Sequence, residues 1–126
     1  MENLNKIERA FENQLENKVA QVIASQTGYV IEVNQCFENT YGYTRHFLIG
    51  KHISEFMPEK YRESHNKRFN EVRCDMTRAT LLDSFILVHI LNREGEEIPV
   101  KVGLSMFCIK NAIYFVATFR KLEDEV

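Results

Sequence analysis

The apolar residues of the N-terminal segment recur at helical spacing. Charged and amide side chains occupy the positions between them. This pattern places one apolar stripe along a helix of about four turns. The stripe consists of Leu4, Ile7, Phe11 and Leu15. We therefore predict that residues 1–17 form an amphipathic helix that flanks a separate domain.

The spacing then changes to that of β-strands. Residues 19–25 and 29–33 are two β-rich runs, and a short turn sequence with Gly28 separates them. This arrangement predicts a β-hairpin. Asn34 follows directly, and its side chain suits the N-cap of a helix that carries Phe37 and ends at Gly42.

A second helix is predicted after Pro58, which suits the first turn of a helix. The apolar and aromatic residues of this stretch are spaced by four, four and three positions, so they share one face. They are Tyr61, His65, Phe69 and Val72. We expect this face, with its single histidine, to point into the protein.

The last third of the chain is rich in strands. Residues 81–91 and 97–107 are linked by a loop with Gly95, where a positive φ is expected. Along the second of these strands, apolar residues from Ile98 to Met106 alternate with polar or small ones, which predicts one buried and one wetter face. A turn at 110–111 leads into a third strand over 112–119. Separate helices and an antiparallel sheet indicate the α+β class.

Composition narrows the class of protein. The chain has 126 residues, of which 44% are hydrophobic and 27% charged, the balance of one globular domain. No run approaches the ~18 apolar residues of a membrane span, and a net charge of −2 offers nucleic acid no general attraction. Cys36, Cys74 and Cys108 never form a CxxC pair, so we expect buried, reduced thiols in a cytoplasmic protein.

The sequence lacks the usual signatures of an active site. His46, His52 and His89 show no metal-ligand spacing with one another or with a cysteine. There is no glycine-rich phosphate loop, and the serines have no nucleophile-elbow context. We expect His46 and His52 to lie on the surface, His89 to face either side of its strand, and the protein not to be an enzyme.

Three stretches together resemble the PAS domain family, the sensor modules of signalling proteins. They read GYVIEVNQCFENTYGY, FLIGKHISEFMP and NREGEEIPVKVGLS, in the order and spacing of PAS domains. The resemblance covers residues 18–120 and leaves 121–126 as a polar exit. It implies a five-stranded antiparallel sheet in the order 2-1-5-4-3, with short helices on one face. It also implies a module that senses a small ligand or relays a signal by protein–protein interaction, with its effector domain or partner outside this chain.

Different PAS subfamilies carry different sequence motifs, and these motifs indicate which cofactor a domain binds. Light-sensing flavin domains need a cysteine after the glycine that Gly50 matches, and GKHISEFMP has none, so we expect no flavin–cysteine adduct. Haem-bearing oxygen sensors resemble MPEKYRESH, in which His65 takes the place of the iron ligand. The arginine that those sensors carry on the following strand is missing from SFILVHI. Two interpretations stay open: an axial histidine in a haem-binding gas or redox sensor, and a structural histidine without a cofactor.

The interior could hold a small ligand. Tyr41, Phe56, Phe69 and Val72 are expected to line such a pocket beside His65. His65, Tyr41 and Asn34 would supply its polar groups. Other apolar residues that could contribute are Phe37, Phe47, Ile53, Phe85, Val102 and Leu104. The alternative is that these residues fill the core among themselves, because close packing is the default for interiors.

The N-terminal stripe predicts a homodimer. An exposed stripe of this size would normally be covered. A second copy of the chain, contacting the stripe and the outer sheet face, would cover it in a dimer. Alternatively, the helix would fold back on its own sheet and leave a monomer. We predict the homodimer, through Leu4, Ile7, Phe11 and Leu15.

Overall fold

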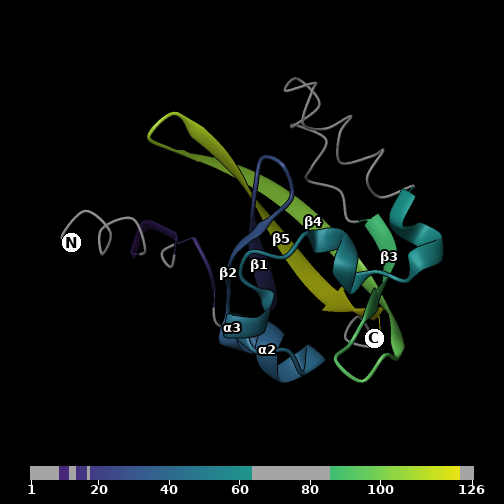
Figure 1. Ribbon diagram of the computed structural model, residues 1–126. Coiled ribbons are helices and arrows are strands. Elements are labelled where there is room, and N and C mark those ends of the chain that lie inside the picture. The colour runs from purple at the N-terminus through teal and green to yellow at the C-terminus, as the bar shows by residue number, and fades with distance from the viewer. Residues whose placement is uncertain (1–8, 12–13, 17, 64–85, 123–126) are drawn as a thin grey trace.

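The computed structural model describes residues 9–11, 14–16, 18–63 and 86–122 (Figure 1). The named elements in these ranges are β1 (Ala20–Ser25), β2 (Val30–Val33), α2 (Gln35–Tyr41), α3 (Arg45–Leu48), a short 3-10 helix η1 (Ile53–Phe56), β3 (Ile86–Leu91), β4 (Glu97–Ile109) and β5 (Ala112–Lys121). Residues 9–11 and 59–63 are also helical. The rest of the helix predicted after Pro58, and the first part of the strand predicted over 81–91, lie outside the described residues.

The strands form one antiparallel sheet in the order β2-β1-β5-β4-β3. Both the strand order and the α+β class agree with the expectation from sequence. The first and last strands in the chain, β1 and β5, lie side by side in the middle of the sheet, from Ala20 opposite Phe119 to Ser25 opposite Tyr114. The N-terminal segment therefore enters the fold at the centre of the sheet.

The β4–β5 hairpin extends past the other strands (Figure 1). Ile109 pairs with Ala112 across a two-residue turn in which both Lys110 and Asn111 have positive φ, 50° and 68°. This tight turn keeps the strands paired to their ends, so β4 is two residues longer than the predicted 97–107. Cys108 lies near this end and is exposed. The expectation of a buried thiol was wrong there, because the hairpin extends beyond the core.

Helix α2 begins and ends as its sequence predicts. The side chain of Asn34 accepts a hydrogen bond from the backbone N–H of Phe37, which satisfies a free donor of the first turn. Gly42 ends the helix at φ 82°, where a residue with a side chain would be strained. These two caps fix the rotation of the helix about its axis, so Phe37 and Tyr41 both point into the core.

The main core lies between the sheet and the short helices (Figure 1). Along β4, Val100 is fully buried and Val102 packs against the same core, while Lys101 lies on the opposite side. The alternation predicted for this strand is therefore confirmed. The buried members of this core are Ala20, Val22, Val30, Val33, Phe37, Tyr41, Tyr43, Leu48, Phe56, Ile90 and Val100.

Candidate functional site

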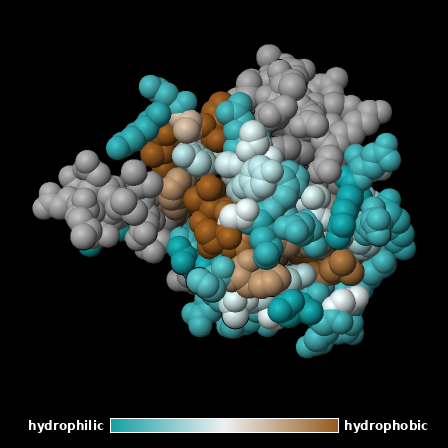
Figure 2. Space-filling view, viewed as in Figure 1, coloured by the Kyte–Doolittle hydropathy of each residue, from teal (hydrophilic) through white to brown (hydrophobic). Residues whose placement is uncertain are grey.

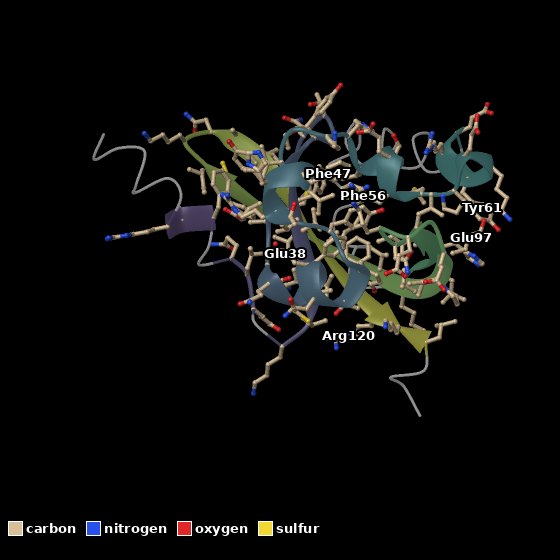
Figure 3. All side chains as sticks on the ribbon, turned by 60° about the horizontal axis from the view of Figure 1, so that its bottom comes forward. Glu38, Phe47, Phe56, Tyr61, Glu97 and Arg120 are labelled. Carbon is tan, nitrogen blue, oxygen red and sulfur yellow. The ribbon has the colours of Figure 1, made fainter. Side chains whose placement is uncertain are left out.

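The interior between the sheet and the helices is lined by aromatic rings. Phe37 is their centre: its ring centroid lies 4.9 Å from Tyr41, 6.1 Å from Phe56 and 5.3 Å from Phe119. Tyr41 and Phe56, which the sequence predicts as pocket lining, are 1% and 4% exposed. Figure 3 shows Phe56 pointing into the space between the helices and the sheet. In this half of the interior the rings pack on one another.

The half of the interior next to β4 is less tightly enclosed by the described residues. Leu104 and Met106 are only partly buried, and they pack with Ile53 around the buried ring of Phe115. Val102 is partly buried as well. The remaining predicted pocket residues, His65, Phe69, Val72 and Phe85, lie outside the described part of the chain.

Asn34 was expected to offer a polar group to a ligand, but its side chain is fully engaged by backbone. Its Oδ1 accepts from the N–H groups of Gln21 and Phe37, at 3.0 and 2.9 Å. Its Nδ2 donates to the carbonyls of Glu16 and Val19, both at 2.6 Å. All the hydrogen-bonding capacity that a buried asparagine normally uses is therefore taken. We correct the prediction: Asn34 holds the segment before β1 against the start of α2.

Gln21 completes this junction. Its Oε1 accepts a hydrogen bond from the backbone N–H of Glu16 at 2.6 Å, and its Nε2 donates to the Thr118 hydroxyl at 3.0 Å. The N-terminal segment is thus tied both to α2, through Asn34, and to the centre of the sheet, through Gln21. The sequence gives no sign of this role, because a glutamine in a strand is most often solvent-facing.

Phe47 does not line the interior as predicted, because it lies on the exposed side of α3 while Leu48 takes the buried side. Its side chain is 37% exposed and stacks on Tyr43, with a centroid distance of 6.1 Å. Tyr43, which the sequence reading missed, is buried, and its hydroxyl donates to the Leu91 carbonyl at 2.7 Å. Burial raises the pKa of the Tyr43 phenol, and the positive charge of Arg93 partly offsets this rise.

Two of the histidines have structural partners. His52 is not a simple surface residue: its Nδ1 accepts from the backbone N–H of Ser54 and caps η1, and its Nε2 lies 3.2 Å from the Thr27 carbonyl. His89 lies beside Glu97, with 3.4 Å between Nδ1 and Oε2, and its ring is 5.3 Å from that of Tyr61. Figure 3 shows Tyr61 and Glu97 at this edge of the sheet. His46 is exposed, as expected.

The outer face of the sheet carries a second apolar cluster. Phe11 is 7% exposed and packs against Ile23 and Val116, on the two central strands. Its ring meets those of Tyr114 and Phe107 edge-on, at centroid distances of 4.9 and 6.0 Å. Partly buried residues surround this contact: Leu15, Ile31, Phe107, Ile109 and Tyr114. Leu4 and Ile7, the other half of the predicted stripe, lie outside the described residues.

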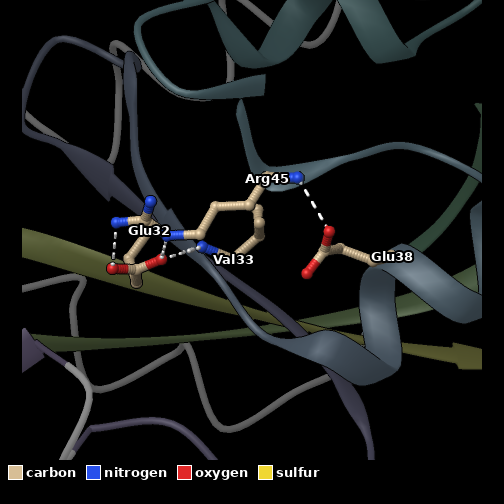
Figure 4. A network of polar contacts seen from close by, with 4 residues as sticks. All are labelled: Glu32, Val33, Glu38 and Arg45. Carbon is tan, nitrogen blue, oxygen red and sulfur yellow. Dashed lines mark hydrogen bonds and ion pairs between the residues drawn. The ribbon is translucent and has the colours of Figure 1, made fainter. Parts of the chain in front are cut away.

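An ion pair connects the edge strand β2 to α3 (Figure 4). The guanidinium of Arg45 binds both carboxylate oxygens of Glu32, with 2.9 Å between Nη2 and Oε2. The Glu32 side chain is 7% exposed and that of Arg45 is 51% exposed. The backbone N–H of Arg45 donates to Glu38 at 2.9 Å, so the same residue also joins α2. This network fixes the two helices against β2.

The described residues provide a limited test of a haem site. The inner face of β3 and β4 presents Val88, Ile90, Val100 and Val102, which could pack against an apolar ring system. Lys101 lies on the other face of β4, whereas Lys121 of β5 pairs with Val100 and shares its face, so this face carries one cation at the end of β5. The described residues also contain no cluster of three histidine, cysteine or acidic side chains that could hold a metal ion. Because His65 lies outside the described residues, the haem interpretation stays a prediction.

A comparison against family models gives a result that agrees with this strand order, with the helices on one face and with the aromatic interior. The model described as "PAS domain" matches residues 18–121. The chain belongs to the PAS domain family. PAS domains are in general sensory or regulatory modules rather than catalysts. No helix in the described residues is long and apolar enough to cross a membrane.

Solved PAS domain structures resemble this chain in fold. The PAS domain of an HTR-like protein from Haloarcula marismortui is 22% identical with a TM-score of 0.70, and 96% of each chain is covered. The PAS domain of the Cronobacter turicensis quorum-sensing receptor RpfR, in complex with C12:0, is 14% identical with a TM-score of 0.67, covering 86% of this chain and 97% of that one. The PAS domain of the fruit-fly ELK potassium channel is 13% identical with a TM-score of 0.65, covering 94% and 96%. A search of curated proteins found no match.

Proposed function

We propose that this PAS domain acts as a sensory module whose output is a change in self-association through the outer face of its sheet. The observation that carries the proposal is the apolar cluster on that face. The outer face of an antiparallel sheet is commonly polar when water covers it. Here the central strands β1 and β5 place Ile23 and Val116 there, and β4 adds Phe107.

The described N-terminal segment covers only part of this cluster. Phe11 and Leu15 contact it, yet Ile31, Phe107 and Ile109 stay partly exposed around them. Figure 2 shows apolar surface gathered between the end of the β4–β5 hairpin and β2. A contiguous apolar patch of this kind favours a protein contact. A second copy that brings the same helix and sheet face would cover it symmetrically.

The junction at Asn34 gives a route from the interior to this face. Asn34 caps α2, whose Phe37 lies at the centre of the aromatic interior, and it also binds the carbonyl of Glu16 in the N-terminal segment. A shift of α2 caused by a ligand would therefore act directly on the segment that covers the outer face. In this proposal Asn34 couples a change in the interior to the segment that covers the outer face.

The first test is the oligomeric state of Phe107→Glu, measured by light scattering after size exclusion. We expect the parent protein to be a dimer and this variant a folded monomer, because a carboxylate in the apolar patch would be desolvated in the dimer. Ile49→Glu is the matched control: it makes the same kind of change after α3, on the helical side of the domain, at a residue that is 37% exposed. If the parent protein is monomeric at every concentration, the proposal is wrong. The N-terminal segment of the same chain would then be what covers the apolar cluster.

A second candidate function is the binding of a small apolar ligand against the inner face of β4. It is favoured by the partial exposure of Leu104 and Met106, and by the similar fold of the RpfR domain, which is described in complex with C12:0. Native mass spectrometry of the purified protein should then show a bound small molecule that Leu104→Asp removes. Ser105→Asp, one residue away on the other face, should retain it. If the parent protein shows only the mass of the chain without a ligand, this candidate function is contradicted.

The haem alternative rests on the motif around His65. We expect no Soret band after expression with a haem precursor, because SFILVHI lacks the arginine that haem-bearing sensors carry on this strand. A near-stoichiometric Soret band that His65→Ala abolishes would instead identify His65 as an iron ligand.

A further inference from the structure

A second surface of the domain, on the helical side, combines an exposed ring with two cations. The ring is that of Phe47 at α3. Lys51 Nζ lies 4.5 Å from its centroid, and Arg93 Cζ, from the loop between β3 and β4, lies 4.3 Å from it. We call Phe47, Lys51 and Arg93 the cation–ring site. Figure 3 shows Phe47 beside the short helices, on the side of the sheet that they cover.

The two positive charges are not neutralised within the described structure. Neither Lys51 nor Arg93 has a carboxylate within ion-pair distance there, whereas Arg45, Lys60 and His89 each have one. Both cations lie close to the same ring centroid, so the distance between them is no more than roughly one Debye length at physiological salt. Salt therefore screens their mutual repulsion only in part. The quadrupole of the ring attracts each of them, but only by about 0.5–1 kcal/mol at an exposed site.

The loop that carries Arg93 is held in place rather than free. The Arg93 backbone N–H donates to the Tyr41 carbonyl at 2.9 Å, and Asn92 accepts from the N–H groups of Glu94 and Glu96. Below the ring, Tyr43 stacks on Phe47 and is fixed by its hydrogen bond to Leu91. The cations and the ring are therefore preorganised, which lowers the entropy cost of binding a partner.

We propose that the cation–ring site docks an acidic segment of a partner protein. Charge complementarity carries the choice of partner. A carboxylate would relieve the repulsion between Lys51 and Arg93, and it could accept a bidentate pair of hydrogen bonds from the guanidinium. An apolar side chain next to that carboxylate would cover the exposed part of the Phe47 ring. A nucleic acid would need a row of cations along its phosphates, and this site offers two.

The test uses the full chain and a synthetic pentapeptide in which a leucine is flanked by two glutamates on each side. Amide NMR spectra would be recorded during titration, with an all-glutamine analogue as the uncharged probe. We expect the acidic peptide to shift the signals of Phe47, Lys51 and Arg93, and the analogue to bind at least about threefold more weakly. Raising salt from about 50 to about 500 mM should weaken the acidic peptide further.

Matched variants decide whether these residues form the site. Lys51→Ala and Arg93→Ala should each weaken the acidic peptide by about threefold or more, whereas Lys18→Ala and Arg9→Ala, which remove exposed cations elsewhere, should leave it unchanged. Equal loss in all four variants, or equal binding of a short oligothymidylate, would overturn the proposal in favour of general charge attraction. If removing residues 123–126 alone shifts the signals of the site, the chain's own acidic end is the occupant and the proposal is wrong.

Discussion

Replacement of Asn34 by alanine tests the idea that one buried side chain holds the N-terminal segment to the sensory core. The alanine removes four hydrogen bonds to backbone, two accepted and two donated. Loss of a helix N-cap costs about 1 kcal/mol. The buried N–H of Gln21 and the buried carbonyl of Val19 are left without this partner, at about 1 kcal/mol or more each. The expected total is therefore about 3 kcal/mol.

The assay is urea unfolding followed by far-ultraviolet circular dichroism. With a urea m-value of about 1.5–2 kcal/mol/M, a loss of about 3 kcal/mol should lower the unfolding midpoint by roughly 1.5–2 M. Thr44→Ala is the control, because Thr44 caps α3 with a single exposed bond to the N–H of Phe47 and should cost no more than about 1 kcal/mol. Asn34→Ser, which retains an acceptor but no amide donor, should fall between the two.

Equal midpoints for Asn34→Ala and Thr44→Ala would refute the reasoning. That result would mean that water satisfies the backbone groups around Asn34 as well as the side chain does. A changed urea dependence in the variant would show that the N-terminal segment had separated from the domain before the main transition. Such separation would itself support the route from α2 to the outer face.

Three further predictions concern single contacts. Gly28→Ala should cost about 2 kcal/mol in melting experiments, because Gly28 has φ 92° and a Cβ there would lie 2.7 Å from the His52 ring; an unchanged melting temperature would contradict this. Arg45→Ala should cost about 2 kcal/mol, because it leaves the buried Glu32 carboxylate without its cation. The cost is smaller than for a fully buried ion pair, since Arg45 is half exposed. Adding Glu32→Gln to this variant should recover part of the lost stability. Because burial raises the pKa of Tyr43 above its ordinary 10.0, the neutral phenol is favoured on folding, so its contribution is complete below about pH 10 and declines above it. Tyr43→Phe should therefore lose stability less steeply than the parent protein between about pH 10 and 11, and parallel curves would contradict this.

Much of the fold was predictable because local patterns agree with it. The alternation along β4 separates Val100 from Lys101 whichever neighbours the strand acquires. The caps of α2 work through backbone geometry at Asn34 and Gly42, so the sequence places them without tertiary information. The strand order came from the family resemblance, since no spacing within the chain specifies which strands pair.

The roles of individual polar residues were harder to predict. Asn34 and His52 bind backbone groups that are distant in sequence, such as those of Glu16 and Thr27, and no local pattern announces those partners. Phe47 was expected in the interior because it is aromatic. Residues of a four-residue helix are too few to define a buried face, and tertiary packing assigned that face to Leu48.

By itself, the sequence determined the class of the domain, its β-hairpins and the two ends of α2, because these depend on spacing, turn residues and backbone caps within short stretches. Only the tertiary structure decided which side chains meet. It brought the N-terminal Phe11 to Ile23 and Val116, tied Asn34 to Glu16, and placed Lys51 and Arg93 over one ring. The physical reason is that burial and charge contacts depend on distances between segments far apart in the chain, and these distances are fixed only when the sheet and helices pack together.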